Sequence, residues 1–201
     1  MPCDEKLTGA IKPNENGEGG ETMEPFQITA RHTVYKGRIF DVSQDLVTLP
    51  GGGTHLYDTV VHPGGAAVLP VDAEGNAYLV RQYRPAAEQF VLEIPAGRME
   101  PGEDPRESVI RELREETGFT AETVEKLTSV YSTIGLCSEV LHLYYAEGLS
   151  LGEQDLDEDE YIAIEKIPLS KLTDMILNNE IIDAKTVVAV TTYLLKKQKN
   201  S

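Results

Sequence analysis

Three closely spaced glutamates are the residues of this sequence best suited to chemistry. Glu115 and Glu116 follow Glu112 by three and four positions, so a helix would place the three carboxylates on one surface. Like charges in that arrangement destabilise a bare helix, whereas a hard divalent cation such as Mg²⁺ binds oxygen ligands and would relieve the repulsion. The alternative is an ordinary exposed acidic face relieved by neighbouring arginines. The helix alone does not decide between the two.

The segment around these glutamates is predicted to be a helix from Pro105 to Thr117. Asp104 is suited to cap its N-terminus, Pro105 suits the first helical position, and Glu107 completes an Asp-x-x-Glu capping box. Gly118 can adopt the left-handed conformation that ends many helices.

A wider pattern surrounds this helix and decides its interpretation. Gly97 is followed after five residues by Glu103, and after seven more by Arg-Glu-Leu-Arg-Glu-Glu-Thr-Gly-Phe at positions 111–119. The pattern resembles the Nudix box at every fixed position. The resemblance implies an α+β chain with the Nudix fold, a mixed β-sheet sandwiched between α-helices, and a loop–helix–loop that holds a metal ion.

The resemblance also assigns roles within this segment. Glu112 and Glu116 would be direct metal ligands and part of the catalytic centre, with Glu115 nearby in the metal site and the Ala96 carbonyl as a further ligand. Arg111 would orient Glu115. The expected cofactor is Mg²⁺, with Mn²⁺ able to replace it.

The similarity extends over about residues 28–197 and is to the ADP-ribose pyrophosphatases. It is carried by His-Pro-Gly-Gly-Ala (62–66), Arg-Gln-Tyr-Arg (81–84), Leu-Glu-Ile-Pro-Ala-Gly (92–97), Leu-Asp-Glu-Asp-Glu (156–160) and Ile-Asp-Ala-Lys-Thr (182–186). The resemblance implies a homodimer that hydrolyses the pyrophosphate bond of ADP-ribose to AMP and ribose 5-phosphate. Another nucleoside diphosphate sugar as substrate, or a non-catalytic nucleotide-binding Nudix module, are the alternatives.

Outside the box, the resemblance implies further site residues. Arg84 would contact the substrate's phosphates or terminal ribose, which suits the fixed charge and forked donors of guanidinium; otherwise it is a surface arginine. Residues 133–139 occupy the place of a family loop that carries a catalytic glutamate. Glu139 is therefore the candidate general base, or else a solvated acid before a strand, and Gly135 is a candidate substrate contact. Ile134 stands where the family usually has proline.

A second departure from the family lies at Tyr57 and Asp58, where the family usually has an Arg-Glu or Trp-Glu pair. Tyr57 is a candidate substrate contact because its ring could stack on a base, and it could equally fill a core or a dimer contact. His62 and Cys137 are predicted to be structural, since neither has a visible partner for nucleophilic or zinc chemistry.

The chain divides into three parts. Residues 1–24 carry six acids against two lysines, which predicts a disordered acidic segment. Residues 25–61 indicate three or four antiparallel strands that form a small β subdomain, and the family resemblance implies that this subdomain mediates dimerisation. Its three glycines at 51–53 favour a hairpin turn over a phosphate-binding loop. Residues 62–201 are assigned to the Nudix hydrolase domain.

Apolar patterning predicts the elements of this larger domain. Strands are expected at 66–71 and 77–82, joined as a hairpin, and at 91–94, 127–131 and 140–146. Helices are expected at 169–177, capped by Ser170, and at 183–195. The acidic cluster 155–160 is predicted to be a solvated loop.

Composition narrows the classes of function. Eighteen basic against thirty-four acidic residues give a net charge of −16, which disfavours binding to nucleic acids or anionic membranes. The sequence contains no apolar run of transmembrane length. Its two cysteines, far apart in sequence, indicate reduced thiols rather than a disulfide framework. We therefore expect a cytoplasmic protein, and the family resemblance implies that it acts on a small-molecule nucleotide sugar.

Overall fold

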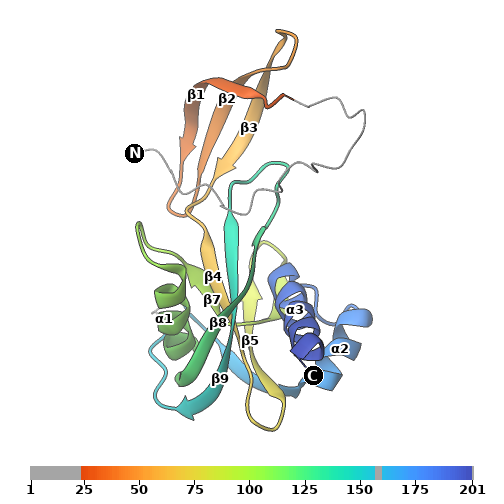
Figure 1. Ribbon diagram of the computed structural model, residues 1–201. Coiled ribbons are helices and arrows are strands. Elements are labelled where there is room, and N and C mark those ends of the chain that lie inside the picture. Colours follow the sequence, from red (N-terminus) through yellow and green to blue (C-terminus); the bar gives the residue numbers. More distant parts are fainter. Residues whose placement is uncertain (1–23, 157–159, 201) are drawn as a thin grey trace.

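The computed structural model describes residues 24–156 and 160–200, which form three β-sheets and three helices (Figure 1). The strands are β1 (Gln27–Lys36), β2 (Asp41–Thr48), β3 (Thr54–Val61), β4 (Gly65–Pro70), β5 (Asn76–Arg84), β6 (Gln89–Glu93), β7 (Ala96–Arg98), β8 (Phe119–Tyr131), β9 (Val140–Leu151) and β10 (Ala163–Pro168). The helices are α1 (Pro105–Thr117), α2 (Leu169–Leu177) and α3 (Ala184–Asn200). The predicted acidic segment 1–24 lies, apart from Glu24, outside the described residues. Among the described helices none is long and apolar enough to cross a membrane.

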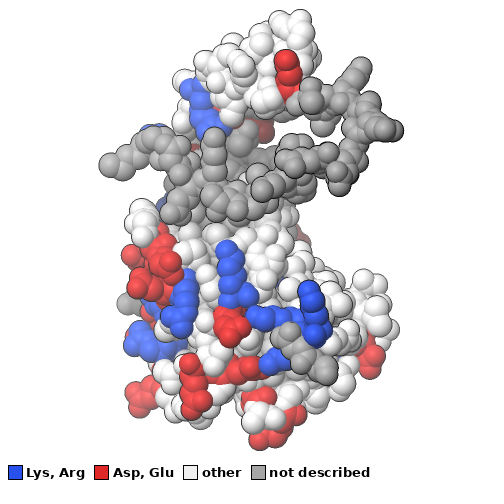
Figure 2. Space-filling view, in the orientation of Figure 1, with Lys and Arg blue, Asp and Glu red and all other residues white. Residues whose placement is uncertain are grey.

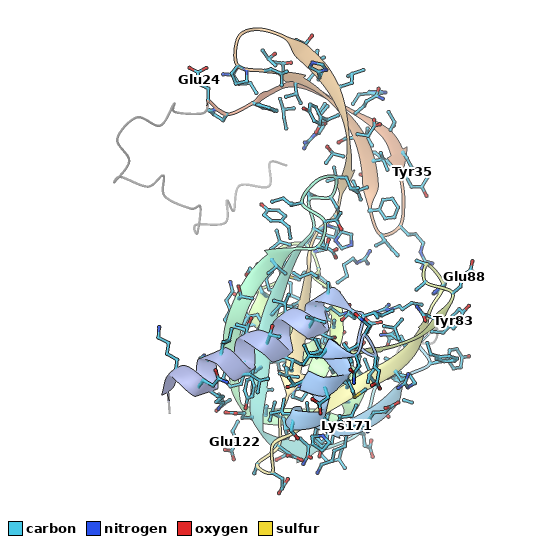
Figure 3. All side chains as sticks on the ribbon, turned by 90° about the vertical axis from the view of Figure 1, so that its right-hand side faces the viewer. Glu24, Tyr35, Tyr83, Glu88, Glu122 and Lys171 are labelled. Carbon is cyan, nitrogen blue, oxygen red and sulfur yellow. The ribbon has the colours of Figure 1, made fainter. Side chains whose placement is uncertain are left out.

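The N-terminal sheet has three antiparallel strands in the order β1-β2-β3. The glycine-rich segment forms the predicted turn between β2 and β3. Gly51 and Gly52 have φ angles of 91° and 94° there, a region that glycine enters without steric cost. Figure 3 shows this sheet projecting from the rest of the chain, with Glu24 near its far end. Every residue of β1 is consequently exposed.

A mixed sheet in the order β7-β4-β9-β8 forms the centre of the larger domain. Its middle strands β4 and β9 are parallel, and the outer pairs are antiparallel. Successive side chains of a strand point to opposite faces: Ala66 and Val68 pack in the core under α1, whereas Ala67 and Leu69 pack in the core under α2 and α3. Helices therefore cover both faces (Figure 1), which confirms the predicted sandwich.

A third sheet, in the order β10-β5-β6, corrects one prediction. Segments 66–71 and 77–82 lie largely in strands and meet at one antiparallel bridge between Val71 and Ala77. The predicted hairpin extends no further, because β4 pairs with β7 and β9 while β5 pairs with β6 and β10. The turn between them is tight, since the Asp72 carboxylate accepts hydrogen bonds from the N–H groups of Glu74 and Asn76 at 3.1 and 2.8 Å. The turn residues therefore predict a change of chain direction but do not determine which strands pair beyond it.

The ends of α1 follow the sequence prediction, and the start of α2 does not. Asp104 Oδ1 accepts a hydrogen bond from a backbone N–H two residues on, at 2.8 Å. Gly118 has a φ of 72° and donates its N–H to the Arg114 carbonyl at 2.8 Å. The predicted cap of α2, Ser170, is wrong: Pro168 occupies the N-cap and makes no side-chain hydrogen bond there.

Candidate active site

The acidic face of α1 is organised around Arg111. Its guanidinium donates hydrogen bonds to Glu112 Oε1 at 2.7 Å, to Glu115 Oε2 at 2.9 Å and to Glu103 Oε1 at 3.1 Å. Figure 2 shows charged side chains of both signs gathered on the body of the molecule, including the region over α1. One arginine therefore offsets part of the repulsion that the spacing of the glutamates creates.

Glu116 lies deeper than the other acids of the helix, with 1% of its surface exposed. Its Oε2 accepts a hydrogen bond from the Ala96 N–H at 3.0 Å. Burial, followed by the charges of Glu112 and Glu160, raises the pKa of Glu116 to about 8, and the Ala96 hydrogen bond opposes this only in part. Burial also raises the pKa of Glu112, against the opposing charge of Arg111. Two buried carboxylates thus share one region at a cost in free energy.

The absence of a side chain at Gly97 allows the backbone of β7 to lie against these acids. A β-carbon at Gly97 would lie 1.8 Å from Glu112 Oε1 and 2.0 Å from the carboxyl carbon of Glu112. Any side chain at this position would have to displace the carboxylate. The glycine that opens the box is therefore required by the close approach of backbone to carboxylate, a use of glycine distinct from a positive φ.

A cavity of about 450 Å³ opens beside β7 and the first turn of α3. This volume is within the range of small-molecule binding sites. The polar and backbone groups that line it include Arg84, Ala96, Gly97, Arg98, Glu139 and Lys185. Because the Glu112 carboxylate lies directly against Gly97, the acids of α1 adjoin the wall of this cavity.

Glu139 reaches the cavity from the segment 132–139. Two backbone hydrogen bonds, 2.8 and 2.9 Å long, join this segment to Val60 at the end of β3. Glu139 Oε1 lies 3.3 Å from His62 Nδ1, and it would lie 3.9 Å from a β-carbon at Gly65. The carboxylate therefore lies at the cavity, and its role as general base stays a prediction.

Arg84 lines the cavity at the end of β5 and is held by a carboxylate that the sequence analysis missed. Glu93, 2% exposed, accepts hydrogen bonds from Arg84 Nε at 2.6 Å and Nη2 at 2.8 Å. Burial alone would raise the pKa of Glu93, but the Arg84 hydrogen bond and the charge of Lys185 hold that pKa below its ordinary value. The signal that could have found it is an acid flanked by Leu92 and Ile94 in a segment predicted to be a strand.

Glu160 is a second residue whose role the sequence analysis missed. It ends the cluster 155–160, predicted to be a solvated loop, of which residues 157–159 lie outside the described part of the chain. The charge of Glu160 raises the pKa of both Glu112 and Glu116. Glu160 therefore adds to the negative potential at the acids of α1, which the prediction of a merely solvated loop did not anticipate.

Two candidate substrate contacts lie away from the cavity. Tyr57 is on β3 with 44% of its surface exposed, and Gly135 lies in the turn that precedes Glu139. Neither lines the cavity, and no atom lies within 4 Å of a β-carbon built at Gly135. Their roles in binding substrate stay predictions, and they require either a ligand that extends beyond the cavity or a second chain.

The groups around Glu116 fit a hard divalent cation. No three His, Cys, Asp or Glu side chains of the described residues converge as ready metal ligands, and Arg111 holds Glu112 and Glu115 instead. The buried pair Glu112 and Glu116 nevertheless repel each other, and a cation between them would remove that cost. Glu112, Glu115, Glu116 and the Ala96 carbonyl stay the predicted ligands, and the structure places Ala96 beside Glu116 through its N–H.

A mixed sheet between helices, with an acidic helix beside a cavity of small-molecule size, is typical of an enzyme that acts on a small molecule. Comparison with known proteins identifies the family. The NUDIX domain profile matches residues 61–189, and the chain belongs to the Nudix family. It is 38% identical to the ADP-ribose pyrophosphatase of Bacillus subtilis (strain 168) over 170 residues, covering 84% of this chain and 92% of the relative. It is 42% identical to the methanol dehydrogenase activator of Bacillus methanolicus over 159 residues, covering 78% of this chain and 86% of that relative. A crystal structure of an ADP compounds hydrolase matches with a TM-score of 0.77 and 25% identity, over 89% of this chain and 98% of that chain.

Proposed function

We propose that this Nudix hydrolase cleaves the pyrophosphate bond of ADP-ribose to AMP and ribose 5-phosphate, with Mg²⁺ as its metal ion and Mn²⁺ able to replace it. The observation that carries the proposal is a cavity lined by Arg84 and Glu139 that adjoins a buried carboxylate pair across Gly97. The similarity to an ADP-ribose pyrophosphatase over most of both chains supports the choice of substrate. Free Cys137 is consistent with the cytoplasm as the place of the reaction.

The proposed reaction assigns one task to each group of the site. A divalent cation, when bound, neutralises charge on the diphosphate and lowers the pKa of a water molecule. Glu139 takes a proton from the attacking water, with a glutamate of α1 as the alternative base. The water oxygen bonds to phosphorus while the bond from that phosphorus to the bridging oxygen breaks. Arg84 binds the phosphates through its charged, planar donors.

We also propose that the active form is a homodimer assembled through the N-terminal sheet. Large apolar side chains are exposed along this part of the chain: Phe26, Ile28, Val34, Tyr35, Ile39, Phe40 and Leu56. Contiguous apolar surface of this kind marks interaction sites. Light scattering at micromolar concentration should give twice the chain mass of 22.1 kDa, and a monomer would contradict the assembly.

The substrate proposal is tested by product identification across a panel of nucleoside diphosphate sugars in Mg²⁺. We expect AMP and ribose 5-phosphate from ADP-ribose, at a higher kcat/KM than for the guanosine and uridine diphosphate sugars. Preferential GMP release from a guanosine diphosphate sugar would favour the alternative substrate class. Saturable ADP-ribose binding without turnover in Mg²⁺ or Mn²⁺ would favour a non-catalytic module, which the complete set of acids in α1 argues against.

A further inference from the structure

Glu93 is a buried carboxylate to which the proposed hydrolysis gives no direct task. It ends β6, is 2% exposed and accepts two hydrogen bonds from Arg84. Its Oε2 also accepts a hydrogen bond from Lys185 Nζ. Removing a carboxylate from water is costly unless it is well paired, and well-packed apolar residues often replace such pairs without loss of stability. Core packing alone therefore gives no reason to place an acid here.

The two cations that hold Glu93 both line the cavity, whereas Glu93 is not among its lining residues. The Arg84 side chain is 43% exposed and that of Lys185 is 10% exposed, against 3% for Glu93. Glu93 takes only two of the five N–H donors that a guanidinium carries, so the other donors of Arg84 are not engaged by it. Tyr83, adjacent to Arg84, marks this end of β5 in Figure 3.

The first turn of α3 is fixed to the end of β6 by further hydrogen bonds. The Ile94 N–H donates to Thr186 Oγ1 at 2.9 Å, and the Thr186 N–H donates to Asp183 Oδ2 at 3.0 Å. Lys185 Nζ lies 3.1 Å from Asp183 Oδ1. Asp183 also lines the cavity, but its two oxygens are paired with Thr186 and Lys185. The position of Lys185 is thus set by the same short segment of β6 that contains Glu93.

We propose that Glu93 is a positioning residue that fixes Arg84 and Lys185 as a rigid pair of cations for a phosphate of the nucleoside diphosphate sugar. The inference rests on the proposed function, because that function supplies the phosphate group that Arg84 and Lys185 would bind. A side chain held in its binding geometry beforehand loses less conformational entropy when the ligand arrives. A free arginine would otherwise lose rotamer freedom on each binding event.

The test compares Glu93→Gln with the wild-type protein in steady-state kinetics on ADP-ribose. Glutamine keeps the shape but removes the charge that aligns both cations. We expect KM to rise about tenfold, the typical worth of a lost charge-assisted pair, while kcat changes less than about threefold because the reacting atoms are not contacted. The matched control is Glu165→Gln, which removes the acid of the Arg81–Glu165 pair on neighbouring strands β5 and β10. Neither residue of that pair lines the cavity, so its KM should stay at the wild-type value.

A double-mutant cycle separates positioning from a general structural role. In an Arg84→Met background, Glu93→Gln should raise KM by no more than about twofold, since its effect passes largely through Arg84. A full further loss in that background, or a wild-type KM for Glu93→Gln alone, would overturn the proposal. Should Glu93→Gln fail to fold, judged by circular dichroism, Lys185→Met provides the same comparison, with a KM rise of about threefold supporting the pair and an unchanged KM contradicting it.

Failure of the proposed function gives a different result. If the wild-type protein cleaves another nucleoside diphosphate sugar but not ADP-ribose, the proposed substrate falls and the same variants are compared on the sugar that is cleaved. If nothing is cleaved, calorimetric Kd values for ADP-ribose decide: weaker binding by Glu93→Gln supports the pair, and equal or undetectable binding by both proteins rejects it.

Discussion

The acidic helix α1 and the N-terminal sheet differ in how far their side chains find partners within the same chain. In α1, the polar residues Ser108, Glu112, Glu116 and Thr117 are buried and their neighbours are supplied by the same chain. In β1 all ten residues are exposed, and the visible face of the sheet in Figure 2 carries few charged side chains. The buried acids of the helix are therefore held by groups of their own chain, whereas the sheet leaves large apolar side chains exposed.

A related contrast appears in the two buried acids that lie outside α1 in the described part of the chain. Asp45 in β2 is 2% exposed and is neutralised by Arg31 of β1, which contacts it through two hydrogen bonds of 2.7 and 2.6 Å. That pair joins adjacent strands and does not line the cavity beside β7. Glu93 instead lies behind two cavity cations. A buried ion pair therefore indicates a site only where its exposed partner faces a cavity.

The largest expected effect is that of Glu116→Gln, which tests whether the acids of α1 hold a metal ion. If Glu116 is a metal ligand, the variant keeps its fold, and its Mg²⁺-dependent turnover rate falls by roughly 10³-fold or more, since a ligand of the catalytic cation has been removed. Product release in saturating Mg²⁺ measures the loss. Glu107→Gln, an exposed acid in the first turn of α1, is the matched control and should retain full activity. Near-normal turnover of Glu116→Gln would refute its assignment as a ligand.

Gly97→Ala tests the same site through steric packing rather than through charge. A methyl group at this position would overlap the Glu112 carboxylate at 1.8 Å, and a displacement of about 1 Å in a catalytic group costs on the order of 10²-fold in rate. We expect a loss in kcat of that size with little change in the thermal midpoint. Gly53→Ala, which meets no atom within 4 Å, is the control. Equal activity of the two variants would show that the close approach of β7 is unnecessary.

The parts predictable from sequence were those governed by local rules. The ends of α1 followed from Asp104, Pro105 and Gly118, because capping and left-handed stops act within one turn. Strand partners could not be derived in that way: β4 and β5 adjoin in sequence, yet they lie in different sheets, because their partners β6, β7, β9 and β10 come from other parts of the chain. The strand predicted at 127–131 is the end of a strand that begins at Phe119, whose earlier half lacks a clear apolar pattern.

The site was predictable where it repeats a local motif and not where distant segments meet. The spacing along one helix and the Nudix-box pattern around it selected Glu112 and Glu116, which the structure buries in one region. The contact of Glu93 with Lys185 joins residues 92 positions apart, and the influence of Glu160 on the acids of α1 likewise depends on the tertiary fold. Neither has a sequence period that could reveal it.

A smaller effect should appear in the stability of the metal-free protein. The pKa of Glu116 is raised from 4.5 to about 8, so the folded state binds this proton more tightly than the unfolded state does. The resulting stabilisation is complete below pH 4.5 and is lost as pH rises through 8. In EDTA, we expect wild-type stability to fall across this window by on the order of 2–4 kcal/mol more than that of Glu116→Gln, a difference of roughly 5–10 °C in thermal midpoint.

Excess Mg²⁺ should reverse that ranking at pH 8 and above, because the wild-type carboxylates bind the cation that glutamine cannot. Thermal scans of both proteins at pH 5 and pH 9, with and without Mg²⁺, measure the effect. Parallel pH profiles in EDTA would show that Glu116 is not the group responsible.

The smallest expected effect tests whether the N-terminal sheet contributes a substrate contact to the candidate active site. Tyr57 lies on β3, outside the cavity of its own chain, so it can contact substrate only where a second chain brings this strand over the cavity or the ligand extends towards it. Tyr57→Ala should then raise KM about threefold at constant kcat, the usual worth of one aromatic contact, while light scattering still shows a dimer. Thr54→Ala alters an exposed residue of the same strand, whose side chain points to the face opposite that of Tyr57, and should leave KM unchanged. Identical KM values for both variants and the wild-type protein would confine the sheet to assembly. A selective loss at Tyr57 would instead support a substrate site that extends from the cavity to the N-terminal sheet.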